Sequence, residues 1–215
     1  MSLGEAVARA FNPDGALARS VKDYVPRAGQ TVMALAVAAK LESGGVLVVE
    51  AGTGVGKTYA YLIPTLLSGE RILISTATKT LQDQLFNRDI PRLITALGLP
   101  VRVALLKGRS SYLCSHRLSF ARHDINAMHP VAQADLTRIE QWALSTRSGD
   151  LAEMLQLDER SPVIPLISST RENCLGAKCP QIKGCHLNLA RREAMIADVV
   201  VVNHHLFFAD LNIRE

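Results

Sequence analysis

The sequence predicts an α/β protein in which an open parallel sheet is flanked by helices and interrupted by a mostly helical insertion. Near both ends of the chain, short apolar runs typical of buried strands alternate with helical segments, as they do in parallel sheets. Between about residues 107 and 186 this alternation stops, and all four cysteines lie in or at the end of that stretch. A chain of 215 residues has room for one sizeable core and a small insertion.

Composition narrows the class of protein. Apolar residues make up 48% and charged residues 20%, which is typical of a folded chain without a long disordered tail. The net charge of +4 and the pI near 9.0 are weak indications of a nucleic-acid partner. The N-terminus lacks the apolar core of a signal peptide, and no apolar run is long enough to cross a bilayer. We therefore expect a cytoplasmic protein with no membrane role.

The first βαβ unit is predicted from four consecutive segments. A helix over residues 30–41 precedes the continuous β-branched run 46–49, which predicts a parallel strand covered on both faces. A helix over 57–67 follows a glycine-rich loop, and 71–75 is predicted as the next strand. The two strands and the helix between them make up this predicted unit.

The alternation continues and later resumes. Helices are predicted over 79–86 and 91–97, followed by a strand over 101–106. After the insertion, a helix over 187–196 and a strand over 198–202 are expected to rejoin the sheet.

The insertion has little strand signal and contains two predicted helices, over 116–125 and 131–146. We therefore predict three parts along the chain: the front of a motor-like α/β domain (1–107), the insertion (108–186) and the return to the first domain (187–215).

A phosphate-binding loop is predicted between the strand 46–49 and the helix 57–67. The motif has alanine where its first glycine usually stands, and consists of Ala51, Gly52, Thr53, Gly54, Val55, Gly56, Lys57 and Thr58. Small residues allow the backbone N–H groups to surround a phosphate, and the following helix directs its positive end to the same charge. Lys57 is expected to reach the β- and γ-phosphates, and the Thr58 hydroxyl to contact Mg²⁺. A glycine-rich turn that only joins strand to helix is the alternative.

Hydrolysis also requires a carboxylate for Mg²⁺ and a residue that orients water. No acidic pair follows a predicted buried strand. We therefore expect the chain to be the front part of a longer enzyme.

The four cysteines are predicted to bind metal. Their spacing, Cys174-x4-Cys179-x5-Cys185 with Cys114 far upstream, is wider than structural zinc sites favour, and Pro180 follows Cys179. A [4Fe–4S] cluster is the preferred interpretation, while zinc and unliganded core cysteines are the alternatives. The residues that would moderate the negative charge of a cluster are Arg117, Lys178, Lys183 and Arg191.

A basic stretch without acidic residues runs from Leu93 to His123. Such a stretch is able to follow a DNA backbone, although a solvated surface is the simpler interpretation of the charges alone. Its members are Arg102, Lys107, Arg109, Arg117 and Arg122. Tyr112 is a candidate for stacking on a base and equally for a core position, and we assign no catalytic role to His204 or His205.

In order and content these motifs resemble the DinG and XPD family of iron–sulfur helicases, and the resemblance covers nearly the whole chain. Arg27 and Gln30 resemble the upstream adenine-reading motif. The other matching segments are Glu50–Thr58 (EAGTGVGKT), Ser75–Thr78 (STAT), Lys107–Cys114 (KGRSSYLC) and Val202–Leu206 (VNHHL).

The resemblance implies a P-loop NTPase (RecA-like) sheet and an ATP-dependent 5′→3′ DNA helicase that uses ATP, Mg²⁺ and a [4Fe–4S] cluster. It implies a monomer acting on single-stranded DNA and on forked or tailed duplexes in repair or replication, and it favours DNA contact for the basic stretch. Lys57 and Thr58 would be the catalytic residues in this chain. The family's Asp-Glu-Ala-His box and second motor domain would lie beyond Glu215, so we expect weak nucleotide binding and negligible unwinding from these 215 residues alone.

Two other classes of protein stay open. One is a nucleotide- and DNA-binding module that senses oxidation through its cluster, and the other is a zinc-containing P-loop ATPase that is not a helicase.

Overall fold

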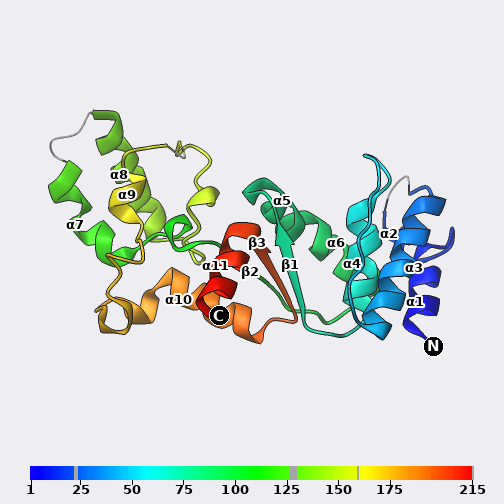
Figure 1. Ribbon diagram of the computed structural model, residues 1–215. Helices are drawn as coiled ribbons and strands as arrows, with labels where there is room; N and C mark the ends of the chain where they lie inside the picture. Colours follow the sequence, from blue (N-terminus) through cyan, green and yellow to red (C-terminus); the bar gives the residue numbers. More distant parts are fainter. Residues whose placement is uncertain (22–23, 126–129, 159, 215) are drawn as a thin grey trace. The chain divides into compact units, whose positions relative to one another are not determined.

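In a computed structural model, the chain forms two compact units (Figure 1). The first unit consists of residues 1–105 and 197–215, and the second of residues 106–196. The described residues are all those from 1 to 215 except 22–23, 126–129, 159 and 215.

A three-stranded parallel sheet lies in the first unit. Its strands are β1 (Ile72–Thr76), β2 (Val103–Leu105) and β3 (Val199–Asn203), in the order β1-β3-β2. In the register of the sheet, Val199 is paired with Ile72 of β1 and with Val103 of β2. The run Val199–Val202 is buried throughout, as a central parallel strand requires. The structure confirms the predicted α/β class and the predicted strands near 71–75, 101–106 and 198–202.

Helices flank this sheet. They are α1 (Leu3–Phe11), α2 (Ala16–Ser20), α3 (Ala28–Ser43), α4 (Lys57–Leu67), α5 (Lys79–Gln84), α6 (Ile90–Leu97) and α11 (His204–Arg214). Helices α1, α3 and α4 pack side by side (Figure 1). Their apolar faces share one core with the sheet and α6, in which Leu62, Ile63 and Leu93 are fully buried. This core fixes the helix that follows the glycine-rich loop.

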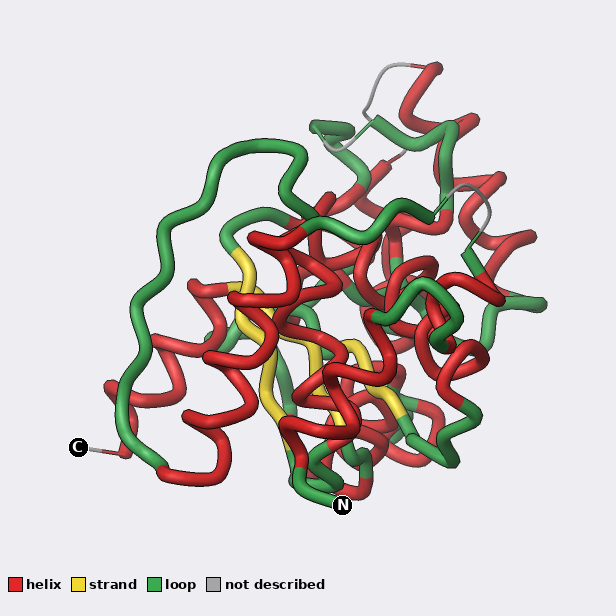
Figure 2. The backbone as a smooth tube through the Cα atoms, turned by 90° about the vertical axis from the view of Figure 1, so that its right-hand side faces the viewer, coloured by secondary structure: helices red, strands yellow, loops and turns green. Residues whose placement is uncertain are grey.

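The predicted strand 46–49 is wrong. Residues 44–56 contain no helix or strand and form a long loop (Figure 2), in which Val46 and Val48 are 84% and 89% exposed. A β-branched run becomes a buried strand only where neighbouring strands satisfy its backbone hydrogen bonds. Within the described residues, the sheet pairs only β1, β2 and β3 with one another, so the run 46–49 has no partner there.

The two helices predicted over 79–86 and 91–97 are joined without a break by a π-helical turn, η1 (Leu85–Asp89). Asp89 is buried at this turn, and its carboxylate accepts hydrogen bonds from Gln84 Nε2 (2.8 Å) and from Arg88 Nε (2.9 Å). Gly98 ends α6 in the left-handed conformation. The π turn therefore places a satisfied carboxylate against the core.

The second unit is mostly helical. Its α-helices are α7 (Ser115–Ile125), α8 (Pro130–Ala143), α9 (Ile164–Ile167) and α10 (His186–Ile196), and its short 3-10 turns are η2 (Arg109–Ser111), η3 (Leu151–Glu153), η4 (Gly176–Lys178) and η5 (Ile182–Gly184). Helix α10, predicted as the start of the return to the first domain, belongs to the second unit instead. Its apolar residues pack against Tyr112, and this contact keeps it there.

The second unit has its own apolar core. Leu113, Leu136, Ile139, Val163 and Ile167 are buried in it, and Trp142 packs against the same cluster. Among the described residues, no helix combines the length and the apolarity that crossing a membrane requires.

Candidate functional site

The glycine-rich loop Ala51–Thr58 lies in the first unit and leads directly into α4. Gly54 and Gly56 have φ angles of +80° and +89°, which residues with a side chain rarely adopt. A Cβ atom on Gly56 would also lie 2.1 Å from Gln30 Nε2. The left-handed backbone therefore favours glycine at position 56, and the amide at the end of the flexible Gln30 side chain lies directly beside it.

Lys57 folds back over this loop. Its Nζ donates to the carbonyl oxygens of Ala51 and Gly52, each at 2.8 Å. The ammonium group is therefore held inside the loop at the N-terminal end of α4, where the backbone N–H groups also favour negative charge. This arrangement suits a polyphosphate, whose oxygens are able to replace the two carbonyls as acceptors.

Arg27 and Gln30, at the start of α3, contact the same loop. The Arg27 guanidinium donates to the Gly54 carbonyl, and Gln30 Nε2 donates to the Gly56 carbonyl at 2.9 Å. Both residues border a cavity of about 450 Å³ beside the loop, together with Thr58 and Tyr59. The structure thus brings the predicted adenine-reading residues and the predicted magnesium-contacting hydroxyl to one site.

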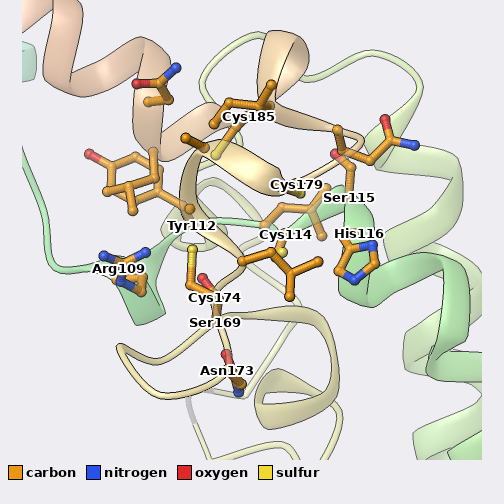
Figure 3. Close-up of a pocket in the computed structure, with 18 of the residues that line it drawn as sticks. Arg109, Tyr112, Cys114, Ser115, His116, Ser169, Asn173, Cys174, Cys179 and Cys185 are labelled. Atoms are coloured by element: carbon orange, nitrogen blue, oxygen red, sulfur yellow. The ribbon is translucent and has the colours of Figure 1, made fainter.

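The four cysteines lie in the second unit and border one cavity of about 370 Å³ (Figure 3). All four are half-buried and carry free thiols. They come from three places: Cys114 precedes α7, Cys185 precedes α10, and Cys174 and Cys179 lie on the loop between α9 and α10. Cysteines 60 to 71 positions apart in the sequence therefore line one cavity.

Short turns shape the loop that carries the middle pair. The Cys179 N–H donates to the Gly176 carbonyl at 3.1 Å, and the Cys179 carbonyl accepts from Ile182 N–H at 3.1 Å. Arg109 and Arg191 border the cavity as well. Their guanidinium groups would complement the negative charge of a thiolate-ligated metal centre at this cavity.

The basic stretch is not a continuous DNA-facing surface. Lys107 is only 2% exposed and forms an ion pair with Asp150 (Nζ to Oδ2, 2.6 Å), so the prediction that it contacts DNA is wrong. Arg102 belongs to the first unit and Arg122 pairs with Glu140. Burial of Lys107 depends on an acidic partner 43 positions away, which a count of basic residues does not reveal.

Tyr112 takes the core position, with 5% of its surface exposed, and does not offer its ring for stacking on a base. Its hydroxyl oxygen accepts a hydrogen bond from the Lys107 N–H at 3.0 Å. Burial raises the pKa of Tyr112 to about 12. The residue is therefore a structural support beside Cys114.

This pKa predicts alkaline sensitivity. Because the folded-state pKa lies above the ordinary value of 10.0, the stability that protonated Tyr112 contributes is complete below pH 10 and is lost as the pH rises to about 12. We expect the free energy of unfolding, measured by urea titration at pH 9 and pH 11, to fall less in Tyr112→Phe than in the wild type. Equal losses in the two proteins would contradict the assignment.

One polar contact was not foreseen from the sequence. Ser75 Oγ lies 2.6 Å from His204 Nδ1, joining the carboxyl ends of the neighbouring strands β1 and β3. The structure thus gives His204 a hydrogen-bonding partner, Ser75. The signal for this pair was the position of both residues at the ends of two predicted parallel strands.

The parallel sheet and its helices make the first unit an α/β fold, in which a glycine-rich loop precedes α4. The family model described as DEAD/DEAH box helicase matches residues 31–159, more than half of the chain, and the chain belongs to this family.

Curated relatives cover nearly all of the chain. It is 45% identical over 215 residues to the ATP-dependent DNA helicase YoaA of Haemophilus influenzae and 47% identical over 205 residues to YoaA of Escherichia coli, matches that include 100% and 95% of this chain. It is 40% identical over 207 residues to the ATP-dependent helicase DinG of Mycobacterium tuberculosis, covering 86% of this chain. The chain spans 34%, 32% and 31% of the lengths of these three relatives.

Proposed function

We propose that this chain is the nucleotide-binding front part of an ATP-dependent DNA helicase. The observation that carries the proposal is the loop Ala51–Thr58, with Lys57 held inside it and Gly56 left-handed before α4, in a member of the DEAD/DEAH box helicase family. Relatives that carry the helicase name match the chain along nearly its whole length. The redox-sensing module and the unrelated ATPase have no comparable support.

Two residues of the loop and two residues beside it have proposed roles. MgATP supplies the phosphoanhydride bond whose hydrolysis drives movement along DNA. Lys57 exchanges the carbonyls of Ala51 and Gly52 for phosphate oxygens, and the Thr58 hydroxyl contacts Mg²⁺. Gln30 offers a donor and an acceptor to the edge of adenine, while Arg27 braces the base.

The four cysteines are the proposed ligands of a [4Fe–4S] cluster. Their thiols share one cavity with two arginines, which suits an anionic tetrathiolate group. Among the described residues, no three His, Cys, Asp or Glu side chains lie close enough together to hold a single metal ion. The spacing Cys174-x4-Cys179-x5-Cys185 is wider than structural zinc sites favour, and it supports a cluster of several metal atoms over zinc. Such a cluster would cross-link the three segments that carry the cysteines.

The proposed substrate is DNA, with single-stranded and forked or tailed duplex forms as the expected partners. We further propose 5′→3′ movement, a monomeric enzyme, a role in DNA repair or replication, and a cytoplasmic location. The DNA substrate agrees with the name of the YoaA relatives, whereas the direction, the pathway and the monomeric state rest on the family resemblance and the location on the N-terminal sequence.

The test uses the complete gene product, purified without oxygen. We expect single-stranded DNA to stimulate ATP hydrolysis, with an apparent DNA affinity that falls as salt rises. A duplex with a 5′ single-stranded tail is expected to be separated faster than one with a 3′ tail, whereas the 215 residues alone separate neither. ATP hydrolysis that is independent of DNA would favour the P-loop ATPase that is not a helicase and contradict the helicase proposal.

A further inference from the structure

A tight corner at residues 148–150 lies between the segments that carry the first and the last cysteine. The Gly149 N–H donates to Thr146 Oγ1 and the Asp150 N–H to Ser148 Oγ, each at 3.0 Å. Asp150 Oδ1 accepts from the Ala152 N–H at 3.1 Å. These local bonds satisfy the backbone of the corner and fix its shape.

On one side, the corner holds the segment of Cys114. The Gly149 carbonyl accepts from the Leu113 N–H at 2.8 Å, and Asp150 pairs with Tyr112 in an antiparallel bridge. The N–H of Cys114 itself donates to the Ile167 carbonyl at 2.7 Å. The backbone leading into the first cysteine is therefore bonded at consecutive residues to two distant segments.

On the other side, the corner contacts the residue after Cys185. Gly149 has φ +64°, and a Cβ atom there would lie 2.2 Å from Cγ of His186. The imidazole ring of His186 thus packs directly on the backbone of Gly149. Because α10 begins at His186, this contact sets where the helix starts and where the preceding cysteine lies.

A buried ion pair secures the same corner. Lys107 Nζ lies 2.6 Å from Asp150 Oδ2, with the two side chains 2% and 12% exposed. Removing one member would leave the other charge buried and uncompensated, which is strongly destabilising. Lys107 also donates its backbone N–H to the Tyr112 hydroxyl. Both ends of the segment 107–112, which precedes Cys114, therefore contact Asp150.

We propose that the corner Gly149–Asp150 is a positioning element that holds Cys114 and Cys185 at the cavity before any metal binds. Cys174 and Cys179 belong to a loop that is shaped mainly by its own short turns. The effect of the corner on iron binding rests on the proposed cluster site. Its effect on the arrangement of the thiols is testable in the metal-free chain.

The experiment compares Gly149→Ala with a matched control, Gly98→Ala. Gly98 has the same φ of +64°, but a Cβ atom there meets nothing within 4 Å. The first measurement is the rate at which each thiol of the metal-free chain reacts with a maleimide, located by mass spectrometry. The second is the rate at which a chelator removes iron after anaerobic reconstitution, with circular dichroism and MgATP binding as measures of folding.

We expect faster labelling of Cys114 and Cys185 in Gly149→Ala, unchanged labelling of the middle pair, and iron loss faster by about 10- to 100-fold. Adding His186→Ala to that variant is expected to restore part of both effects, because it removes the ring that the new methyl group meets. Gly98→Ala is expected to behave as the wild type. Labelling of all four thiols at wild-type rates in Gly149→Ala would overturn the proposal.

A second variant tests the ion pair if Gly149→Ala fails to fold. Asp150→Asn is expected to speed the labelling of Cys114, and Lys107→Met added to it is expected to reverse part of the change because no buried charge is then left alone. Glu140→Gln, which breaks the more exposed pair with Arg122, is the matched control. A wild-type chain that binds no iron would refute the cluster, while the labelling rates would still decide the role of the corner.

Discussion

Replacing Lys57 with alanine is expected to weaken MgATP binding by about 10- to 100-fold, because charge-assisted hydrogen bonds to a phosphate contribute about 1.5 to 3 kcal/mol. The ammonium group already lies inside the loop, bonded to two of its carbonyls at 2.8 Å, so little reordering is needed for it to meet a phosphate. Titration calorimetry with MgATP measures the change directly. ATP hydrolysis by the complete gene product is expected to fall to background in the same variant.

Lys79→Ala is the matched control for this measurement. Lys79 is exposed and is also the first residue of a helix, α5, but it is outside the glycine-rich loop. Its replacement is expected to leave MgATP affinity unchanged in the absence of DNA. If Lys57→Ala bound MgATP as tightly as Lys79→Ala, the loop would be a connection between elements and the proposed motor function would fail.

Replacing Cys114 with serine is expected to reduce iron bound after anaerobic reconstitution to background. Serine keeps the size of the side chain but removes the thiolate that binds iron. Iron and sulfide analysis, together with the brown colour of the sample, measure the loss. The result is expected to be as severe for each of the other three cysteines, because all four border the same cavity.

Ser119→Ala is the control for this substitution, since Ser119 is an exposed residue of α7 that does not border the cavity. It is expected to retain the iron content of the wild type. Stoichiometric zinc in place of iron in the wild-type chain, purified and reconstituted without oxygen, would refute the cluster and favour a structural zinc site.

Local patterns predicted most of the sheet and its helices. The β-branched run 199–202 and the helix 57–67 have sequence signals that agree with their surroundings, and both appear where expected. The run 46–49 has an equally strong signal but no pairing strand within the described residues. The hydrophobic pattern of a segment indicates whether it is suited to burial. Whether it forms a strand also depends on which other segments the fold places beside it.

Helix α1 was overlooked although its sequence signal was present. Ser2 and Glu5 form a reciprocal capping box, with Ser2 Oγ accepting from the Glu5 N–H and Glu5 Oε2 accepting from the Ser2 N–H. Helix α11 has a comparable start, where Asn203 Oδ1 accepts from the Leu206 N–H at 2.7 Å. A search for caps would have indicated both helices.

Most residues of the candidate sites could be proposed from the sequence, but the tertiary contacts that hold them in place could not. The loop Ala51–Thr58 and the four cysteines were recognised from residue type and spacing. The ion pair between Lys107 and Asp150 joins residues with no periodic relation, and nothing in the local sequence marks it. Such long-range contacts arise from the tertiary fold, which residue counts do not encode.

The order of strands in the sheet has a consequence for synthesis on the ribosome. β3 lies between β1 and β2, yet it is the last of the three to be translated, after the whole of the second unit. Until residues 199–203 emerge, β1 and β2 lack the neighbour to which both hydrogen-bond, and their unpaired edges are open to association with other chains. Closing the sheet requires contacts across more than ninety intervening residues, which slows folding. A nascent chain that stalls within the second unit would therefore depend on chaperones to stay soluble.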